Sequence, residues 1–156
     1  ALELYEESLD IRRELAGRLS GDVQARRDLT VALNNVAGML KHSDPGRALE
    51  LYEESLGISR ELAARLPGNL QALWDLGVAA GRLAQLLPTE DPERVSLWRE
   101  AAISLRDALA IQPEHRELAR MSYYAARRYA DCDPDDRDEW LAYAAELAER
   151  FGFGKQ

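Results

Sequence analysis

Cysteine and long hydrophobic runs are almost absent from this 156-residue sequence. Cys132 has no second cysteine to pair with, so an internal disulfide is excluded and a reducing cytosol is the expected setting. No apolar run approaches the roughly 20 residues that span a bilayer, and no signal peptide opens the sequence. We therefore expect a cytoplasmic protein with no membrane partner. The formal net charge is −8, which argues against a nucleic-acid partner because such binding needs a basic surface.

The common signatures of a catalytic or metal centre are missing as well. No serine stands in a nucleophile elbow, and no glycine-rich loop follows a strand. His42 and His115 have no carboxylate or cysteine at ligand spacing, which argues against a metal site. Cys132 lies between Asp131 and Asp133, whose charges disfavour a reactive thiolate. We expect no enzyme activity, no cofactor and no metal.

One acidic segment is similar to the start of a calcium-binding EF-hand loop, because Asp131, Asp133 and Asp135 alternate along it. The glycine that such a loop requires is Asp136 here, and its twelfth residue is Ala142 in place of glutamate. We interpret these acids as a helix start that faces the positive end of the helix dipole. Weak cation binding is the alternative.

What the sequence does contain is a repeated helix. Residues 1–19, ALELYEESLDIRRELAGRL, and residues 48–66, ALELYEESLGISRELAARL, differ at three positions. The same shift of 47 residues aligns Asp44-Pro45 with Asp91-Pro92, and a further shift of 42 reaches Asp133-Pro134. Self-similarity at a fixed period is typical of helical repeat proteins, in which stacked copies cover each other's apolar faces.

Apolar residues recur at helical three- and four-residue steps, as at positions 95, 98, 102, 105 and 109. Trp98 and Trp140 occupy equivalent positions and are expected in the core. Each Asp-Pro pair predicts a helix start, with an aspartate N-cap and proline at the first helical position. The expected fold is all-α, with seven helices at about 1–19, 22–43, 45–66, 69–87, 92–112, 114–132 and 134–151.

We expect these helices to form a single domain over residues 1–156. Its expected parts are a half repeat at 1–21, repeats at 22–68 and 69–112, a divergent repeat at 113–151 and a tail at 152–156. The sequence begins at Ala1, inside the repeat pattern, and the first copy lacks its first helix. We therefore expect a fragment of a longer protein.

Two stretches are similar to known signatures of the tetratricopeptide repeat. The second-helix signature A-x3-Y/F-x2-A-L-x-L is similar to the residues Ala48, Tyr52, Ser55, Leu56 and Ile58. The run Leu33-Asn34-Asn35-Val36-Ala37 resembles the L-N-N-L-A stretch of the longer repeats in kinesin light chains. The period here is 47 or 42 residues, against about 34 in the usual repeat. The resemblance implies a right-handed helical solenoid of antiparallel helix pairs, and a protein-binding part of a larger, bacterial-type protein.

The resemblance also implies that the first helix of each repeat lines a concave groove that binds a peptide. The candidate positions on that side are Arg27, Asn34, Asn35, Lys41, His42, Trp74, Arg82, Gln85, Arg120, Tyr123, Tyr124 and Arg127. The three first helices carry net charges of +1, 0 and +1, whereas the second helices carry −2, −1, 0 and −4. Asparagine amides pair with a peptide backbone and arginines pair with carboxylates, so we expect an extended or helical peptide of acidic character. The alternative is that these arginines are solvated or pair with acids such as Asp28 and Glu117.

A second hypothesis is structural. The helix at 1–19 has no partner helix before it, so a stripe formed by Leu2, Tyr5, Leu9 and Leu15 is expected to be exposed. Exposed apolar surface of this kind favours association with a second copy. The sequence therefore also predicts a homodimer through the N-terminal helix.

Overall fold

The computed structural model describes residues 1–154, and over these residues the chain is all-α, with seven helices and no strand. Their bounds are α1 Leu2–Arg18, α2 Val23–Leu40, α3 Pro45–Arg65, α4 Leu70–Leu86, α5 Pro92–Ile111, α6 Arg116–Cys132 and α7 Arg137–Phe151. The all-α class is therefore confirmed. Six of the seven helices begin within two residues of the predicted position. Within the same residues, no helix combines the length and the apolarity that crossing a membrane requires.

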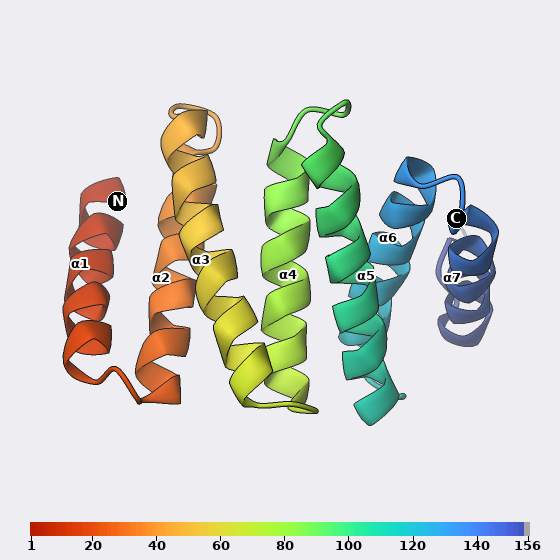
Figure 1. Ribbon diagram of the computed structural model, residues 1–156, viewed down its shortest axis with the longest axis horizontal. Helices are drawn as coiled ribbons and strands as arrows, with labels where there is room; N and C mark the ends of the chain where they lie inside the picture. The colour runs from red at the N-terminus through yellow and green to blue at the C-terminus, as the bar shows by residue number, and fades with distance from the viewer. Residues whose placement is uncertain (155–156) are drawn as a thin grey trace. The chain divides into compact units, whose positions relative to one another are not determined.

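The helices fall into two compact units, Ala1–Arg65 and Leu66–Gln156. Unit 1 contains α1 to α3, and unit 2 contains α4 to α7. Inside each unit every helix packs against the next one along the chain. Figure 1 shows that neighbouring helices within a unit run in opposite directions. This consecutive antiparallel packing is the arrangement expected of helical repeats.

The helix starts follow from side-chain caps. The Asp22 and Asn69 side chains accept hydrogen bonds from the backbone N–H groups of Ala25 (2.8 Å) and Ala72 (3.0 Å). Asp91 caps α5 by accepting from the Glu93 N–H at 2.9 Å, with a proline at the start of the helix. Such caps satisfy backbone donors that have no partner inside the helix.

The third Asp-Pro pair does not start a helix, so the prediction that α7 begins at Pro134 is wrong. Asp133 is the C-cap of α6, and its Oδ1 accepts from the Asp135 N–H at 3.0 Å. Residues 134–136 form a turn, and α7 begins at Arg137. The aspartate still caps a backbone N–H, but a turn follows it in place of a helix.

The predicted core tryptophans are confirmed. Trp98 and Trp140 are buried, and Tyr129 packs edge-on against Trp140 with ring centroids 5.6 Å apart. In unit 1 the most deeply buried large side chains are Leu9, Leu33 and Val36. The predicted exposed stripe on the first helix is partly wrong, because Leu9 faces this core, where it is 1% exposed.

Candidate functional site

A groove in unit 2 is built by α4, α5 and α6 and has a volume of about 420 Å³. Volumes of roughly 300 to 1,000 Å³ are typical of ligand sites. The lining residues are Gly77, Val78, Gly81, Arg82 and Gln85 of α4, Trp98, Ala101 and Leu105 of α5, and Arg120, Met121, Tyr124 and Ala125 of α6.

Two glycines of α4 allow α5 to pack closely beside the groove. A Cβ at Gly77 would lie 2.5 Å from Cγ of Leu105, and one at Gly81 would lie 3.4 Å from the Trp98 ring. Glycine inside a helix costs about 0.5–1 kcal/mol relative to alanine, so two of them one turn apart indicate a steric requirement. Here the requirement is the close approach of Leu105 and Trp98. At Gly77 and Gly81, α4 therefore contributes no side chain to the groove.

Polar side chains from α4 and α6 occupy the rest of the lining. Arg82 and Gln85 come from α4, and Arg120 and Tyr124 come from α6; all four are exposed. Gln85 Nε2 donates to Tyr124 Oη at 3.4 Å, which joins the two helices. The Tyr124 ring lies edge-on to Trp98, with centroids 5.9 Å apart. Four predicted groove residues therefore line one site.

The groove is cationic although the chain is acidic. Two arginines and no carboxylate line it. Within residues 1–154, Arg82 has no ion-pair partner, and Arg120 contacts only an aromatic ring, that of Phe153, 5.9 Å from its guanidinium carbon. Neither guanidinium is neutralised by a described residue, so on this part of the chain both are available to a carboxylate from outside.

Trp98, which lines the groove, has a buried donor without a partner in residues 1–154. The buried indole Nε1 of Trp98 has no hydrogen-bond partner among the described residues. A buried donor without a partner costs free energy, and the core of unit 2 carries that cost here.

Three other predicted residues of unit 2 lie beside the groove lining. Trp74 Nε1 lies 3.1 Å from Sδ of Met121, one of the lining residues. Arg127 donates to Tyr123 Oη at 2.9 Å. This hydrogen bond raises the pKa of Arg127 above its ordinary value, with a smaller contribution from the nearby Asp131 charge. The Trp74 ring also packs edge-on against His115, and the Tyr123 ring packs against Phe153. None of the three residues lines the groove itself.

The remaining predicted residues belong to unit 1. Asn35 is exposed and lines a smaller hollow between α1 and α2, where Arg12 and Asp28 form an ion pair at 3.1 Å. Asn34 is half-buried, and no described residue hydrogen-bonds to its Oδ1. Arg27 on α2 is half-buried; Lys41 and His42, which follow α2, are exposed. The hollow at Asn35 contains a carboxylate and so differs in charge from the groove of unit 2.

Sequence reasoning missed the apolar part of the groove. Trp98 and Leu105 were assigned to core packing, and Met121 was not considered. The signal that could have revealed them is the pair Gly77 and Gly81, one turn apart inside a helix, where glycine is unfavourable. Which side chains of α5 and α6 meet these glycines depends on helix packing, which the spacing does not specify.

The acidic segment after α6 is organised by a tyrosine. Tyr129 Oη lies 2.9 Å from Oδ2 of Asp133 and 2.7 Å from Oδ2 of Asp136. Burial, followed by these two hydrogen bonds, raises the pKa of Tyr129 well above its ordinary value. The same contact lowers the pKa of Asp133. No group of three His, Cys, Asp or Glu side chains suited to a metal ion occurs among residues 1–154.

No family model matches the chain, and no curated protein matches it significantly. The structure accordingly defines the class of protein, an all-α protein of consecutive antiparallel helices, with a groove of defined chemistry in unit 2.

Proposed function

We propose that this protein is a non-catalytic interaction module of the tetratricopeptide-repeat kind. Its ligand is a peptide or protein segment that bears carboxylates next to a large apolar side chain, and it binds in the groove of unit 2. The observation that carries the proposal is the lining of that groove. It has no carboxylate and two arginines without acidic partners among residues 1–154, in a chain of net charge −8.

Each part of the ligand follows from a part of the groove. Val78, Met121 and Tyr124 supply the accessible apolar surface of the groove, above the buried Trp98 and Leu105. This surface favours an apolar side chain, because burying apolar area contributes about 25 cal/mol per Å². Arg82 and Arg120 favour carboxylates, because guanidinium–carboxylate hydrogen bonds are among the strongest in proteins. Gln85 can pair with a peptide backbone through either its amide N–H or its oxygen.

The setting of the module belongs to the same proposal. We place it in the cytoplasm, as part of a larger bacterial protein; the single cysteine and the repeat signature at residues 48–58 support this setting.

The test measures, by fluorescence polarisation, the binding of a fluorescein-labelled peptide in which glutamates flank one central leucine. We expect binding that weakens as salt is added, because charge pairing is screened. Reversing both groove charges, in Arg82→Glu/Arg120→Glu, is expected to weaken binding roughly tenfold or more, since a hydrogen bond to a charged group contributes about 1.5–3 kcal/mol.

A matched control keeps the net charge change but moves it away from the groove. Arg65→Glu/Arg99→Glu reverses two exposed arginines that do not line the groove, on α3 and α5, and should bind the peptide nearly as well as the parent. A second control replaces the peptide's glutamates with lysines, and this peptide should not bind. Equal binding by both double variants, or tight binding of the lysine peptide, would show that the groove assignment is wrong.

A further inference from the structure

The two nearly identical helices of unit 1, α1 and α3, have different surroundings. Leu51 and Leu62 of α3 are each 5% exposed, whereas their counterparts in α1, Leu4 and Leu15, are 70% and 44% exposed. The sequences around these positions are almost the same. The difference therefore comes from what lies beside each helix.

The α3 helix is covered by α2, which precedes it and runs antiparallel to it. The contact is close, because a Cβ at Gly38 of α2 would lie 3.6 Å from the Tyr52 hydroxyl oxygen. No described helix precedes α1, which packs on α2 mainly through Leu9 and Ala16. The same helical face that accepts an antiparallel helix in α3 is thus open in α1.

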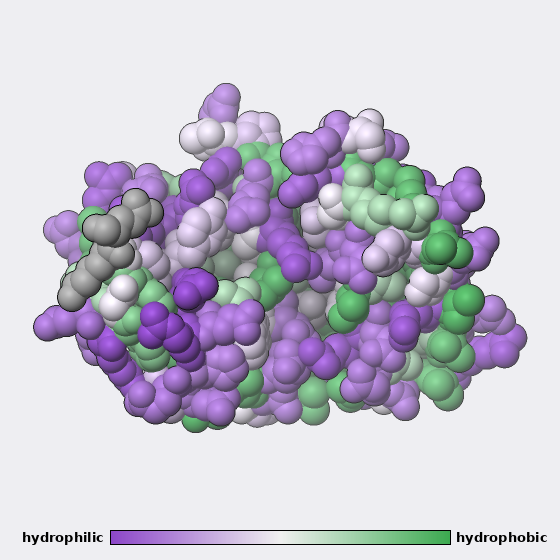
Figure 2. Space-filling view, turned by 180° about the vertical axis from the view of Figure 1, so that it is seen from behind, coloured by the Kyte–Doolittle hydropathy of each residue, from purple (hydrophilic) through white to green (hydrophobic). Residues whose placement is uncertain are grey.

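We call the open surface the α1 face and define it by its exposed apolar side chains, Leu4, Tyr5, Ile11 and Leu15. Hydrophobic side chains gather over α1, at the right-hand edge of the view in Figure 2. Glu7 and Arg12 lie beside Leu4, Ile11 and Leu15 in the same shallow surface.

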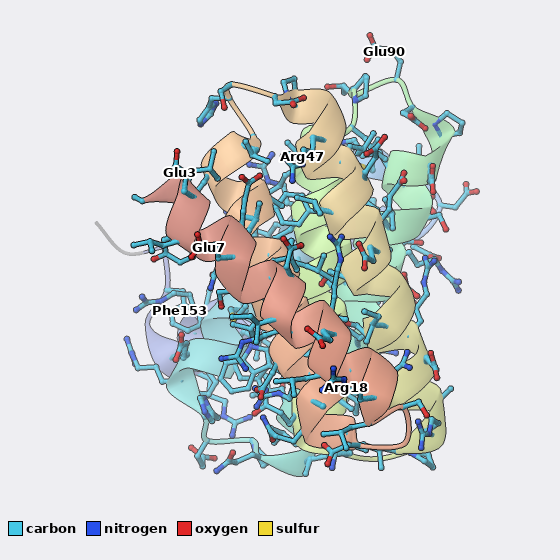
Figure 3. The ribbon with its side chains drawn as sticks, turned by 90° about the vertical axis from the view of Figure 1, so that its left-hand side faces the viewer. Glu3, Glu7, Arg18, Arg47, Glu90 and Phe153 are labelled. Atoms are coloured by element: carbon cyan, nitrogen blue, oxygen red, sulfur yellow. The ribbon has the colours of Figure 1, made fainter. Side chains whose placement is uncertain are left out.

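The charges of α1 are divided between its two halves. The first half carries four acids and no base, and the second half carries three arginines and one acid. Figure 3 shows Glu3 and Glu7 near the beginning of the helix and Arg18 at its other end. Each arginine has an ion pair within the chain, Arg12 with Asp28, Arg13 with Glu54 and Arg18 with Glu14. The remaining division of charge still favours an antiparallel copy of the helix over a parallel one.

From these observations we infer that the α1 face binds the α1 face of a second copy of this chain, with the two helices antiparallel about a two-fold axis. With the axis between Ser8 and Ile11, Leu4 of each copy lies opposite Leu15 of the other. Glu7 then lies opposite Arg12, which has donors left for it beside its ion pair with Asp28. An interface of one helix face is small, so the dimer is weak and depends on concentration.

Sedimentation equilibrium of the full chain, up to roughly millimolar concentration, tests the dimer. We expect reversible dimers in the parent chain and at least a tenfold weaker association for Ile11→Glu, which places a charge in the interface. The matched control is Ile111→Glu at the end of α5, because Ile111 is 48% exposed and Ile11 is 58% exposed. This control should dimerise within about twofold of the parent.

Disulfide trapping tests the orientation and does not depend on the stability of the glutamate variant. In a Cys132→Ser background, chains with Leu4→Cys mixed with chains with Leu15→Cys should crosslink more efficiently than either variant alone. A parallel pair would instead crosslink each variant with itself. The antiparallel pair should also dissociate as sodium chloride is added, because opposite charges are screened.

A chain that stays monomeric at the highest concentration, an association that Ile11→Glu leaves unchanged, or efficient self-crosslinking of each cysteine variant would overturn the inference. The α1 face shares no residue with the groove of unit 2. Peptide binding and dimerisation can therefore fail independently of each other.

Discussion

The Tyr129 hydroxyl group has one proton and two carboxylate neighbours. It lies within hydrogen-bond distance of Asp133, which ends α6, and of Asp136, which precedes α7. Its ring remains in the core against Trp140. The buried tyrosine thus connects the packing of the last two helices to the turn between them.

Replacing Tyr129 with phenylalanine should raise the pKa of Asp133. The hydrogen bond from Tyr129 is the largest cause that lowers this pKa below its ordinary value of 3.8. A carboxyl with a lowered folded-state pKa stabilises the fold above its unfolded-state pKa, and the contribution is lost as pH falls through the folded-state value. In Tyr129→Phe we therefore expect the pKa of Asp133 to lie closer to 3.8. The measurement is a pH titration of the carboxyl carbon chemical shift by NMR.

A matched control for this titration is Tyr143→Phe. The Tyr143 hydroxyl pairs with Ser122 Oγ at 2.8 Å and not with a carboxylate. Removing this hydroxyl should leave the pKa of Asp133 unchanged. An unchanged Asp133 pKa in Tyr129→Phe would contradict this prediction. It would mean that hydrogen bonds from the backbone N–H groups of the turn, and not the one from Tyr129, lower the pKa of Asp133.

Among the helices, glycine serves two different purposes. A Cβ at Gly57, on the exposed side of α3, would meet nothing within 4 Å, whereas one at Gly77 in α4 would collide with Leu105. Both residues are in helix interiors, where alanine is favoured by about 0.5–1 kcal/mol. Burial alone separates the two sites.

Alanine should therefore have opposite effects at the two positions. Gly57→Ala is expected to stabilise unit 1 by about 0.5–1 kcal/mol, and Gly77→Ala is expected to destabilise unit 2 by about 1–3 kcal/mol because it overpacks Leu105. Urea unfolding measures both effects. All three tryptophans lie in unit 2, so fluorescence follows the Gly77 variant and hydrogen exchange follows the Gly57 variant. Destabilisation by both substitutions would contradict the open space at Gly57.

The helix α1 is joined to unit 1 by a small core contact and by ion pairs. Only Leu9 and Ala16 are buried in it. Arg13 pairs with Glu54 at 2.6 Å, Arg47 pairs with Glu6 at 2.6 Å, and the Glu54 contact raises the pKa of Arg13. These pairs are well exposed, so each contributes at most about 1 kcal/mol and is screened by salt.

At the scale of the whole molecule, stability should therefore be uneven. We expect amide hydrogen exchange at low protein concentration to be faster in α1 than in α2 or α5, which bury seven and eight residues. Adding about 1 M sodium chloride should accelerate exchange in α1 more than in α5, because the Debye length falls to roughly 3 Å. Exchange in α1 that is as slow as in α5 and insensitive to salt would contradict this account.

Much of the architecture could be predicted because the positions of helices depend on short-range patterns in the sequence. The duplicated stretch, the Asp and Asn caps and the three- and four-residue apolar steps are short-range features, and they predicted the helices to within a few residues. The exception, Asp133, shows the limit of such features. An Asp-Pro pair can cap either a helix or a turn. At Asp133 it caps a turn, and the same side chain is contacted by Tyr129 of the preceding helix, which the short-range pattern does not show.

The candidate site was predicted only on its polar side. Arg82, Gln85, Arg120 and Tyr124 were expected together because the resemblance implies that the first helix of each repeat lines one groove. These four residues do line the groove of unit 2. The apolar residues Trp98, Leu105 and Met121 were not expected there. Their presence depends on how closely α5 approaches the glycines of α4.

By itself the sequence determined that this protein is helical, where six of its seven described helices begin to within two residues, and that two of them are nearly the same. These properties depend on interactions between residues at most a few positions apart. Only the tertiary structure decided that one of the twin helices is covered and the other open, and which side chains form the groove of unit 2. The physical reason is that burial depends on neighbours distant in the sequence, so identical residues have different environments.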